Sequence, residues 1–137
     1  IVDDSRVIHR MIRDMFSGAQ IEILDAKDGI EGFALIDRER PNLILLDWLM
    51  SKQGGWETLQ QIQAEPQLRT IPLVVMSGRK DEVTEKISEP FASFEFLKKP
   101  FTREELIAAI KSAQKKVPAA ISPEDKILQL ERQITKM

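Results

Sequence analysis

The sequence predicts an α/β fold with a parallel sheet of five strands. Apolar runs of a strand's length alternate with helical patterns along the chain, which is typical of consecutive β-α-β units. The runs are continuous rather than alternating, as in strands that are covered by helices on both faces. The chain has 137 residues and no cysteine, and its net charge is −2. That length fits one ordinary domain with a short appendage.

The five expected strands cover residues 1–2, 21–26, 42–47, 71–76 and 93–97. Doubly wound sheets of five strands commonly take the order 2-1-3-4-5, the flavodoxin-like arrangement. The chain opens with an apolar pair instead of methionine. We therefore expect it to be a segment of a longer protein, in which further residues extend the first strand.

Five helices are expected to follow these strands. The first should begin after Ser5 and end at Gly18, the third should span residues 56–63, and a weakly packed fourth should lie within residues 79–90. Capping boxes predict the starts of the second and fifth helices, from Asp28 with Glu31 and from Thr102 with Glu105. The apolar residues expected to face the core are Ile8, Met11, Ile12, Met15 and Phe16 in the first helix, Ile30, Phe33, Ala34 and Ile36 in the second, and Leu106, Ile107 and Ile110 in the fifth.

The composition changes after Lys116. Residues 1–116 are expected to form the main domain, residues 117–121 a linker, and residues 122–137 a C-terminal helix. An a/d heptad seam in that helix consists of Ile127, Leu130, Ile134 and Met137. Because two heptads are short for a coiled coil, two interpretations stay open: the start of a coiled coil that forms a homodimer, and a surface helix that folds back on its own domain.

Polar side chains follow four of the five strands. Asp3 and Asp4 follow the first strand, Asp47 ends the third, Ser77 follows the fourth, and Lys99 follows the fifth. Because parallel strands end at the same edge of a sheet, we expect three carboxylates, a hydroxyl and an ammonium group to meet there. Ligands bind at this edge in open α/β sheets, at the point where the strand order reverses.

Three neighbouring carboxylates require cations. Two carboxylates about 4 Å apart repel each other by roughly 4 kcal/mol at an effective dielectric constant near 20. A divalent cation together with Lys99 would offset this repulsion, and ligands that are all oxygen favour Mg²⁺ or Mn²⁺ over Zn²⁺. Asp47 is the expected nucleophile for a phosphoryl group, because it ends a central strand and a glycine-containing loop follows it.

Composition also excludes several classes of function. No apolar run approaches the roughly 20 residues of a membrane helix, and no secretory leader is visible, so we expect a cytoplasmic protein without membrane contact. Acidic and basic residues are mixed along the chain, and without a basic stripe direct binding of nucleic acid by this segment is not expected. Neither a P-loop nor a GxGxxG motif is present.

Four short motifs resemble those of one family. Ile-Val-Asp-Asp-Ser at residue 1, Leu-Leu-Asp-Trp-Leu-Met at residue 45, Met-Ser-Gly at residue 76 and Phe-Leu-Lys-Lys-Pro-Phe at residue 96 are similar to the signatures of the receiver domain of two-component response regulators. The resemblance covers about residues 1–116. It implies a phosphorylation-controlled switch that acts on no external substrate and accepts its phosphoryl group from a histidine kinase or a phosphotransfer protein.

The resemblance also implies a role for individual residues. Asp47 would be the phosphoacceptor, Asp4 a direct Mg²⁺ ligand, Asp3 a ligand through water, and the main-chain carbonyl of Leu49 a further ligand. Ser77 and Lys99 would each contact a phosphoryl oxygen. The peptide bond between Lys99 and Pro100 would be cis, and Phe96 would be the switch aromatic. The surface of the fourth helix, fifth strand and fifth helix would then change on phosphorylation.

Some positions depart from the family pattern, and two other functions are disfavoured. Ser51 stands where proline is usual and Gly78 where alanine is common, while Leu49 and Arg79 occupy positions that predict a slowly hydrolysed phosphoaspartate.

A haloacid-dehalogenase-like phosphatase is disfavoured, because it needs a second acid where Leu49 stands. A degenerate receiver is disfavoured by the complete acidic cluster. His9, the sole histidine, is expected to be an exposed surface residue.

Overall fold

The computed structural model describes residues 1–116, and the predicted linker and C-terminal helix lie outside this range. Eight elements follow one another within this range. They are α1 (Arg6–Met15), α2 (Gly29–Glu39), β1 (Ile44–Asp47), α3 (Gly55–Ala64), β2 (Leu73–Ser77), α4 (Lys80–Thr84), β3 (Glu95–Lys98) and α5 (Arg103–Lys116). The three strands form a parallel sheet in the order β1-β2-β3. An α/β architecture with a parallel sheet is therefore confirmed.

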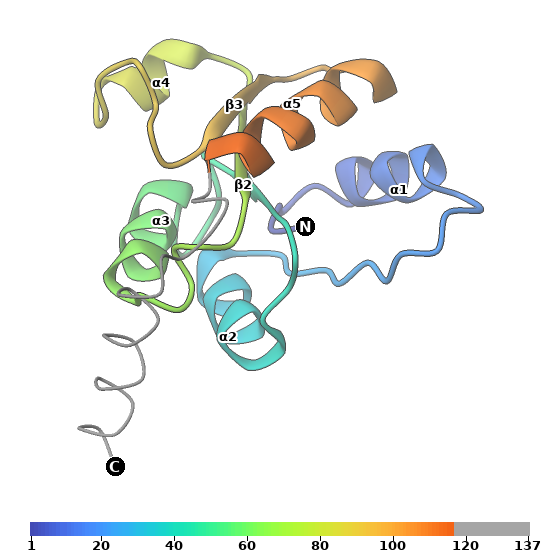
Figure 1. Ribbon diagram of the computed structural model, residues 1–137, viewed down its shortest axis with the longest axis horizontal. Helices are drawn as coiled ribbons and strands as arrows, with labels where there is room; N and C mark the ends of the chain where they lie inside the picture. The colour runs from blue at the N-terminus through green and yellow to red at the C-terminus, as the bar shows by residue number, and fades with distance from the viewer. Residues whose placement is uncertain (117–137) are drawn as a thin grey trace.

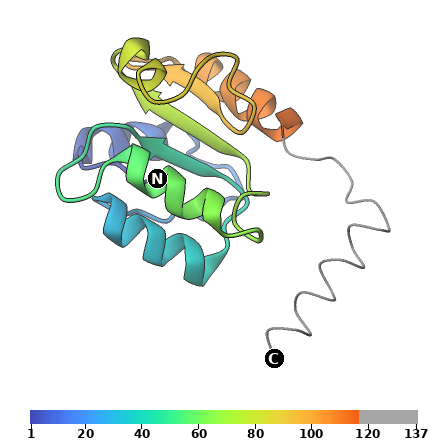
Figure 2. The same cartoon turned by 90° about the vertical axis from the view of Figure 1, so that its left-hand side faces the viewer.

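Helices cover both faces of this sheet, because successive strand residues point to opposite faces. On one face, α1 and α5 pack against a buried cluster that includes Leu45, Val74 and Met76. On the other face, α2 and α3 pack against a cluster that includes Leu46 and Val75. Figure 1 shows α1 and α5 together on one side of the sheet, and Figure 2 shows α2 and α3 side by side. Burial on both faces explains the continuous apolar runs in the sequence.

The first two predicted strands are present only as single bridges. Val2 forms parallel bridges with Ala26 and with Leu46. Its N–H donates to the Leu45 carbonyl at 2.8 Å, and its carbonyl accepts from the N–H of Asp47 at 2.8 Å. Residues 21–25 form no strand, and Ile21 is exposed. The sheet thus has three strands where five were expected, and the order 2-1-3-4-5 stays a prediction.

Within residues 1–116, each of the three N-cap residues expected from the sequence accepts a hydrogen bond from its helix, although only the capping box of Thr102 and Glu105 shows both of its bonds. The Ser5 hydroxyl accepts from the N–H of Ile8 at 3.4 Å, and the Asp28 carboxylate accepts from the N–H of Glu31 at 2.9 Å. At the start of α5, the Thr102 hydroxyl accepts from the N–H of Glu105 while the N–H of Thr102 donates to the Glu105 carboxylate, both at 3.1 Å. These bonds satisfy N–H groups that the first turn of a helix leaves free.

Three helical predictions need correction. Helix α1 ends at Met15 and not at Gly18. Ile30 is 58% exposed and Ala34 is exposed, so α2 faces the core with Gly32 and Ile36. Gly32 is buried because α2 approaches Val2 so closely that a Cβ would lie 2.6 Å from a Val2 methyl carbon. The fourth helix covers only Lys80–Thr84 of the predicted residues 79–90, and Val83 is its sole buried residue. Because Ile87, the other apolar residue of this segment, is only partly buried, the later residues gain little by continuing the helix.

The N-terminus of α3 lies directly on the backbone that follows β1. A Cβ added at Gly55 would lie 2.5 Å from the Asp47 carbonyl oxygen and 2.8 Å from the Cα of Trp48. We predict that Gly55→Ala lowers the free energy of unfolding by about 1–3 kcal/mol, as overpacking does elsewhere. Gly78→Ala is the matched control, because no atom lies within 4 Å of its added Cβ. Urea unfolding of both variants checks this, and equal stability would contradict it.

Candidate functional site

The carboxyl edge of the sheet gathers the polar residues that the sequence placed at strand ends. Asp47 is the last residue of β1, Ser77 is the last of β2, and Lys99 directly follows β3. Asp3 and Asp4 follow the bridging residue Val2, next to β1. Parallel pairing of β1 with β2 and of β2 with β3 points these ends the same way. The predicted cluster of acids and lysine is therefore present.

Three carboxylates meet in this cluster. One carboxylate oxygen from each of Asp3, Asp4 and Asp47 lies within 4.8 Å of the other two. Asp3 is fully buried and Asp47 is 5% exposed, whereas Asp4 is exposed to solvent. The Asp3 carboxylate also accepts from the N–H of Ser5 at 2.9 Å. A set of carboxylate oxygens with one member open to solvent fits a hard divalent cation with water in its shell.

Lys99 neutralises part of this charge. Its ammonium group donates to Asp3 Oδ2 at 2.7 Å and to Asp47 Oδ1 at 3.1 Å. Burial opposes the charge on Lys99, but the hydrogen bond with Asp3 and the charges of Asp3 and Asp47 outweigh it and raise the pKa of the lysine. Lys99 is therefore a fixed cation between two buried acids. The bond between Lys99 and Pro100 is cis, as expected.

Asp47 holds its proton more tightly than an ordinary aspartate. Burial, followed by the nearby charge of Asp3, raises the pKa of Asp47 from its ordinary value of 3.8 to about 6, although Lys99 acts in the opposite direction. The single ammonium group of Lys99 thus leaves the negative charge on Asp47 incompletely compensated. A bound cation would supply the missing positive charge and favour the ionised, nucleophilic form of this carboxylate.

The Ser77 hydroxyl lies at the carboxyl edge of the sheet, but its hydrogen-bond partners are Arg79 and Glu82, at the start of α4. It is within donating distance of Glu82 Oε2 at 2.9 Å and of the Arg79 carbonyl at 3.0 Å, and it accepts from the N–H of Arg79 at 3.2 Å. Sequence reasoning missed Glu82. A spacing of five residues between a serine and an acid matches no capping motif, so the sequence carries no local signal for this contact.

Two further predicted residues are Leu49 and Phe96. Leu49 is 62% exposed in the loop after β1. Phe96 is half-buried, and its ring centroid lies 6.5 Å from that of Phe91 and 5.9 Å from the ammonium nitrogen of Lys80. The carbonyl of Leu49 as a metal ligand and Phe96 as the switch aromatic stay predictions.

The prediction for His9 is wrong. Its side chain is only 14% exposed, because the ring is held between two acceptors. Nδ1 lies 2.8 Å from a carboxylate oxygen of Asp25, and Nε2 lies 2.6 Å from the Asp3 carbonyl oxygen. Arg13 bonds to the same Asp25 carboxylate. Burial alone would raise the pKa of Asp25, but hydrogen bonds with Arg13 and then His9 outweigh it and lower that pKa. The cluster ties α1 to the segment before Ala26.

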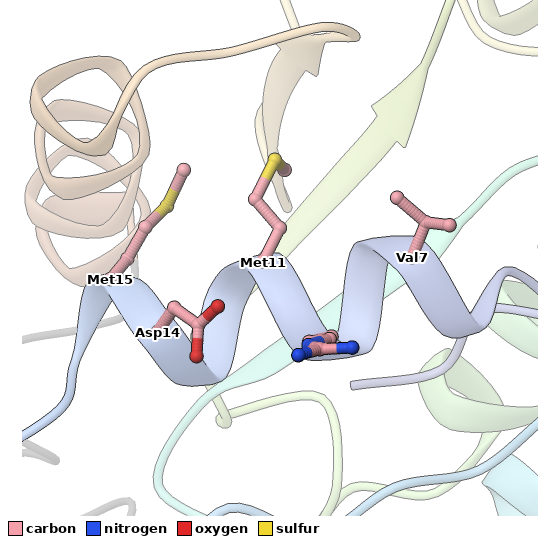
Figure 3. Close-up of a pocket in the computed structure, with 5 residues that line it drawn as sticks. Val7, Met11, Asp14 and Met15 are labelled. Atoms are coloured by element: carbon pink, nitrogen blue, oxygen red, sulfur yellow. The ribbon is translucent and has the colours of Figure 1, made fainter.

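A separate hollow of about 650 Å³ lies against α1. Its lining consists of Val7, Arg10, Met11, Asp14 and Met15 (Figure 3). None of these residues belongs to the carboxylate cluster, and α1 supplies all of them. The hollow is therefore a surface feature of one helix and not part of the acidic site.

The sheet is parallel, helices cover both of its faces, and three carboxylates and a lysine meet at its carboxyl edge. This arrangement is typical of α/β proteins that bind their ligands at the strand ends. The family model described as the response regulator receiver domain matches residues 1–111. The chain therefore belongs to the response regulator receiver domain family of two-component systems.

Relatives and solved structures agree with this assignment. The response regulator MprA of Mycobacterium leprae is 32% identical over 81% of this chain, which spans about half (48%) of the length of MprA. The chemotaxis response regulator CheY4 of Vibrio cholerae is 27% identical, with a TM-score of 0.70 over 82% of this chain and 93% of that one. The Mn²⁺-bound response regulator Rcp1 is 27% identical, with a TM-score of 0.61 over 83% and 86%. No helix within residues 1–116 is long and apolar enough to cross a bilayer.

Proposed function

We propose that this domain is a signalling switch that accepts a phosphoryl group on Asp47. The observation that carries the proposal is the position of Asp47. It ends β1, it is nearly buried, and it shares Lys99 with a second buried acid in a domain of the receiver family. The donor would be a phosphohistidine of a histidine kinase or of a phosphotransfer protein. In the order 2-1-3-4-5, which we also propose, the segment at Val2 would lie beside β1 and the segment at Ala26 beside Val2.

The chemistry requires one displacement. A carboxylate oxygen of Asp47 attacks the phosphorus atom, a P–O bond forms, and the P–N bond to the donor imidazole breaks with its electron pair going to nitrogen. Lys99 sits within bonding distance of Asp47, where it can balance charge on the incoming phosphoryl oxygens. The product is an acyl phosphate on Asp47.

A divalent cation would bind to the three carboxylates. Asp4 is the proposed direct ligand, Asp3 the ligand through water, and the Leu49 carbonyl a further ligand. Mg²⁺ is the proposed ion, and Mn²⁺ is a chemically similar alternative, which the Mn²⁺-bound Rcp1 supports. When bound, the ion supplies positive charge that screens the acids from one another and from the phosphoryl group.

The proposed output is a change in the surface formed by α4, β3 and α5. Phosphorylation adds about −1.5 to −2 charge units at the end of β1. Ser77 would turn toward a phosphoryl oxygen, and Phe96 would move into the space that opens. Leu49 and Arg79 stand two residues after Asp47 and Ser77, where they would hinder an attacking water, so we also propose slow loss of the phosphoryl group.

Treatment with acetyl phosphate and Mg²⁺ tests this function. We expect the intact mass of the domain to rise by one phosphoryl group, and the increment to disappear with hydroxylamine, which cleaves acyl phosphates. Addition of EDTA before the acetyl phosphate should prevent the gain. Asp47→Asn should gain nothing, because an amide oxygen is a poor nucleophile. An equal mass gain in Asp47→Asn would contradict the assignment of the acceptor.

A further inference from the structure

The Ser77 hydroxyl has one proton and two acceptors in this structure. Glu82 Oε2 lies 2.9 Å from its oxygen, and the carbonyl of Arg79 lies 3.0 Å away. A hydroxyl donates one hydrogen bond at a time, and a carboxylate is the stronger acceptor of the two. Ser77 is 2% exposed, so little solvent competes for this bond. The Glu82 carboxylate is thus the preferred partner of the proton on Ser77.

Glu82 is also attached to the segment that carries Asp47. The indole N–H of Trp48, the residue after Asp47, donates to the Glu82 carbonyl at 3.1 Å. Trp48 is buried, and Glu82 lies in the five-residue helix α4, whose buried anchor is Val83 (Figure 1). One residue of α4 therefore bonds to both strand ends that border the acceptor site. Glu82 thus connects α4 with both of these strand ends.

We propose that Glu82 is a latch that holds Ser77 and α4 in the unphosphorylated state, a regulation that rests on the proposed function. A phosphoryl group on Asp47 needs the same Ser77 proton that Glu82 accepts, so the two bonds exclude each other. The added negative charge also repels the Glu82 carboxylate. Phosphorylation and the bond between Ser77 and Glu82 are consequently opposed, and the domain binds a phosphoryl group more weakly than it would without Glu82.

Beryllofluoride, a mimic of the phosphoryl group, provides a direct measure of this opposition. We expect Glu82→Ala to bind beryllofluoride about tenfold more tightly than the unmodified chain at saturating Mg²⁺, as loss of a competing charge-assisted hydrogen bond predicts. Glu82→Gln should bind about threefold more tightly, because its amide oxygen still accepts from Ser77 while the charge is gone. Titrations followed by fluorine NMR of the bound beryllofluoride measure these affinities.

A double-mutant cycle separates the hydrogen bond from the charge. In a Ser77→Ala background the hydroxyl is absent, so Glu82→Ala and Glu82→Gln should bind beryllofluoride equally. Glu85→Ala and Glu85→Gln are the matched controls, since Glu85 is an exposed acid at the end of the same helix. Both controls should stay within about twofold of the unmodified chain, because an exposed charge is screened by solvent.

The affinities for beryllofluoride distinguish failure of the latch from failure of the proposed function. Binding by Glu82→Ala that is no tighter than that of the Glu85 variants overturns the latch, as does a difference between Glu82→Ala and Glu82→Gln that persists without the Ser77 hydroxyl. If Glu82→Ala does not fold, as judged by circular dichroism, Glu82→Gln against Glu85→Gln carries the test. Failure of the proposed function looks different: the unmodified chain would show no Mg²⁺-dependent binding of beryllofluoride, or Asp47→Asn would bind it equally well.

Discussion

Replacement of Lys99 with methionine is expected to lower the free energy of unfolding by about 3 kcal/mol near neutral pH in buffer without divalent cations. Lys99 donates to the fully buried Asp3 at 2.7 Å and to the nearly buried Asp47 at 3.1 Å. Without its ammonium group, two buried carboxylates would face each other with no cation between them. Removal of one partner from a buried ion pair is costly because the remaining charge is left without compensation.

Urea unfolding measures this loss, and Lys98→Met is the control. Lys98 neighbours Lys99 but is exposed, so its replacement should change stability by less than about 0.5 kcal/mol. Saturating Mg²⁺ should recover part of the loss in Lys99→Met, because the cation also screens the acids. A Lys99→Met variant as stable as Lys98→Met would contradict the charge balance described for the site.

Asp47→Asn is expected to stabilise the domain in the absence of divalent cations, by about 2–3 kcal/mol near neutral pH. The pKa of Asp47 is raised from 3.8 to about 6 in the folded domain. The folded state therefore binds more protons than the unfolded state within that window, and stability falls as the pH rises through it. A tenfold difference in proton affinity corresponds to about 1.36 kcal/mol, so the ionised Asp47 destabilises the folded state by about 3 kcal/mol above the window. Asparagine removes the charge that causes the cost.

A series of urea unfolding curves between acidic and neutral pH, with EDTA present, checks the sign. The difference in stability between Asp47→Asn and the unmodified chain should be small at the acidic end and grow as the pH rises through the window from 3.8 to about 6. Saturating Mg²⁺ should reduce the advantage of the variant, because the ion compensates the charge on Asp47. A variant less stable than the unmodified chain in EDTA near neutral pH would show that Asp47 does not destabilise the fold.

Sequence patterns predicted the site better than they predicted the sheet. Asp47 and Lys99 each stand next to an apolar run, and parallel pairing of the runs brings their side chains together. That argument depends only on where strands end. The extent of a strand depends on its neighbours, and the segment at residues 21–25 has only the short run around Val2 beside it. Local sequence patterns do not show how many residues of a strand pair with its neighbours. For this reason they did not predict that the first two strands would be reduced to single bridges.

Two of the residues that sequence reasoning missed depend on contacts between distant segments, and the third depends on a turn. Ile30 fits a helical stripe, but α2 turns Gly32 toward Val2 and leaves Ile30 exposed. His9 lies on the polar side of α1, but its two ring nitrogens contact the Asp25 carboxylate and the Asp3 carbonyl, which belong to other segments of the chain. Glu82 reaches Ser77 because the chain turns between β2 and α4. None of these three contacts follows from periodicity or capping.

The most direct test of the proposed switch is chemical identification of the acceptor residue. Borohydride reduces an aspartyl phosphate to homoserine, so reduction after treatment with acetyl phosphate and Mg²⁺ marks the acceptor, and peptide mass spectrometry locates it. We predict homoserine at position 47 and aspartate at positions 3 and 4. Homoserine at position 3 or 4, or unchanged aspartate at all three positions in a protein that has gained the phosphoryl mass, would contradict the assignment of Asp47.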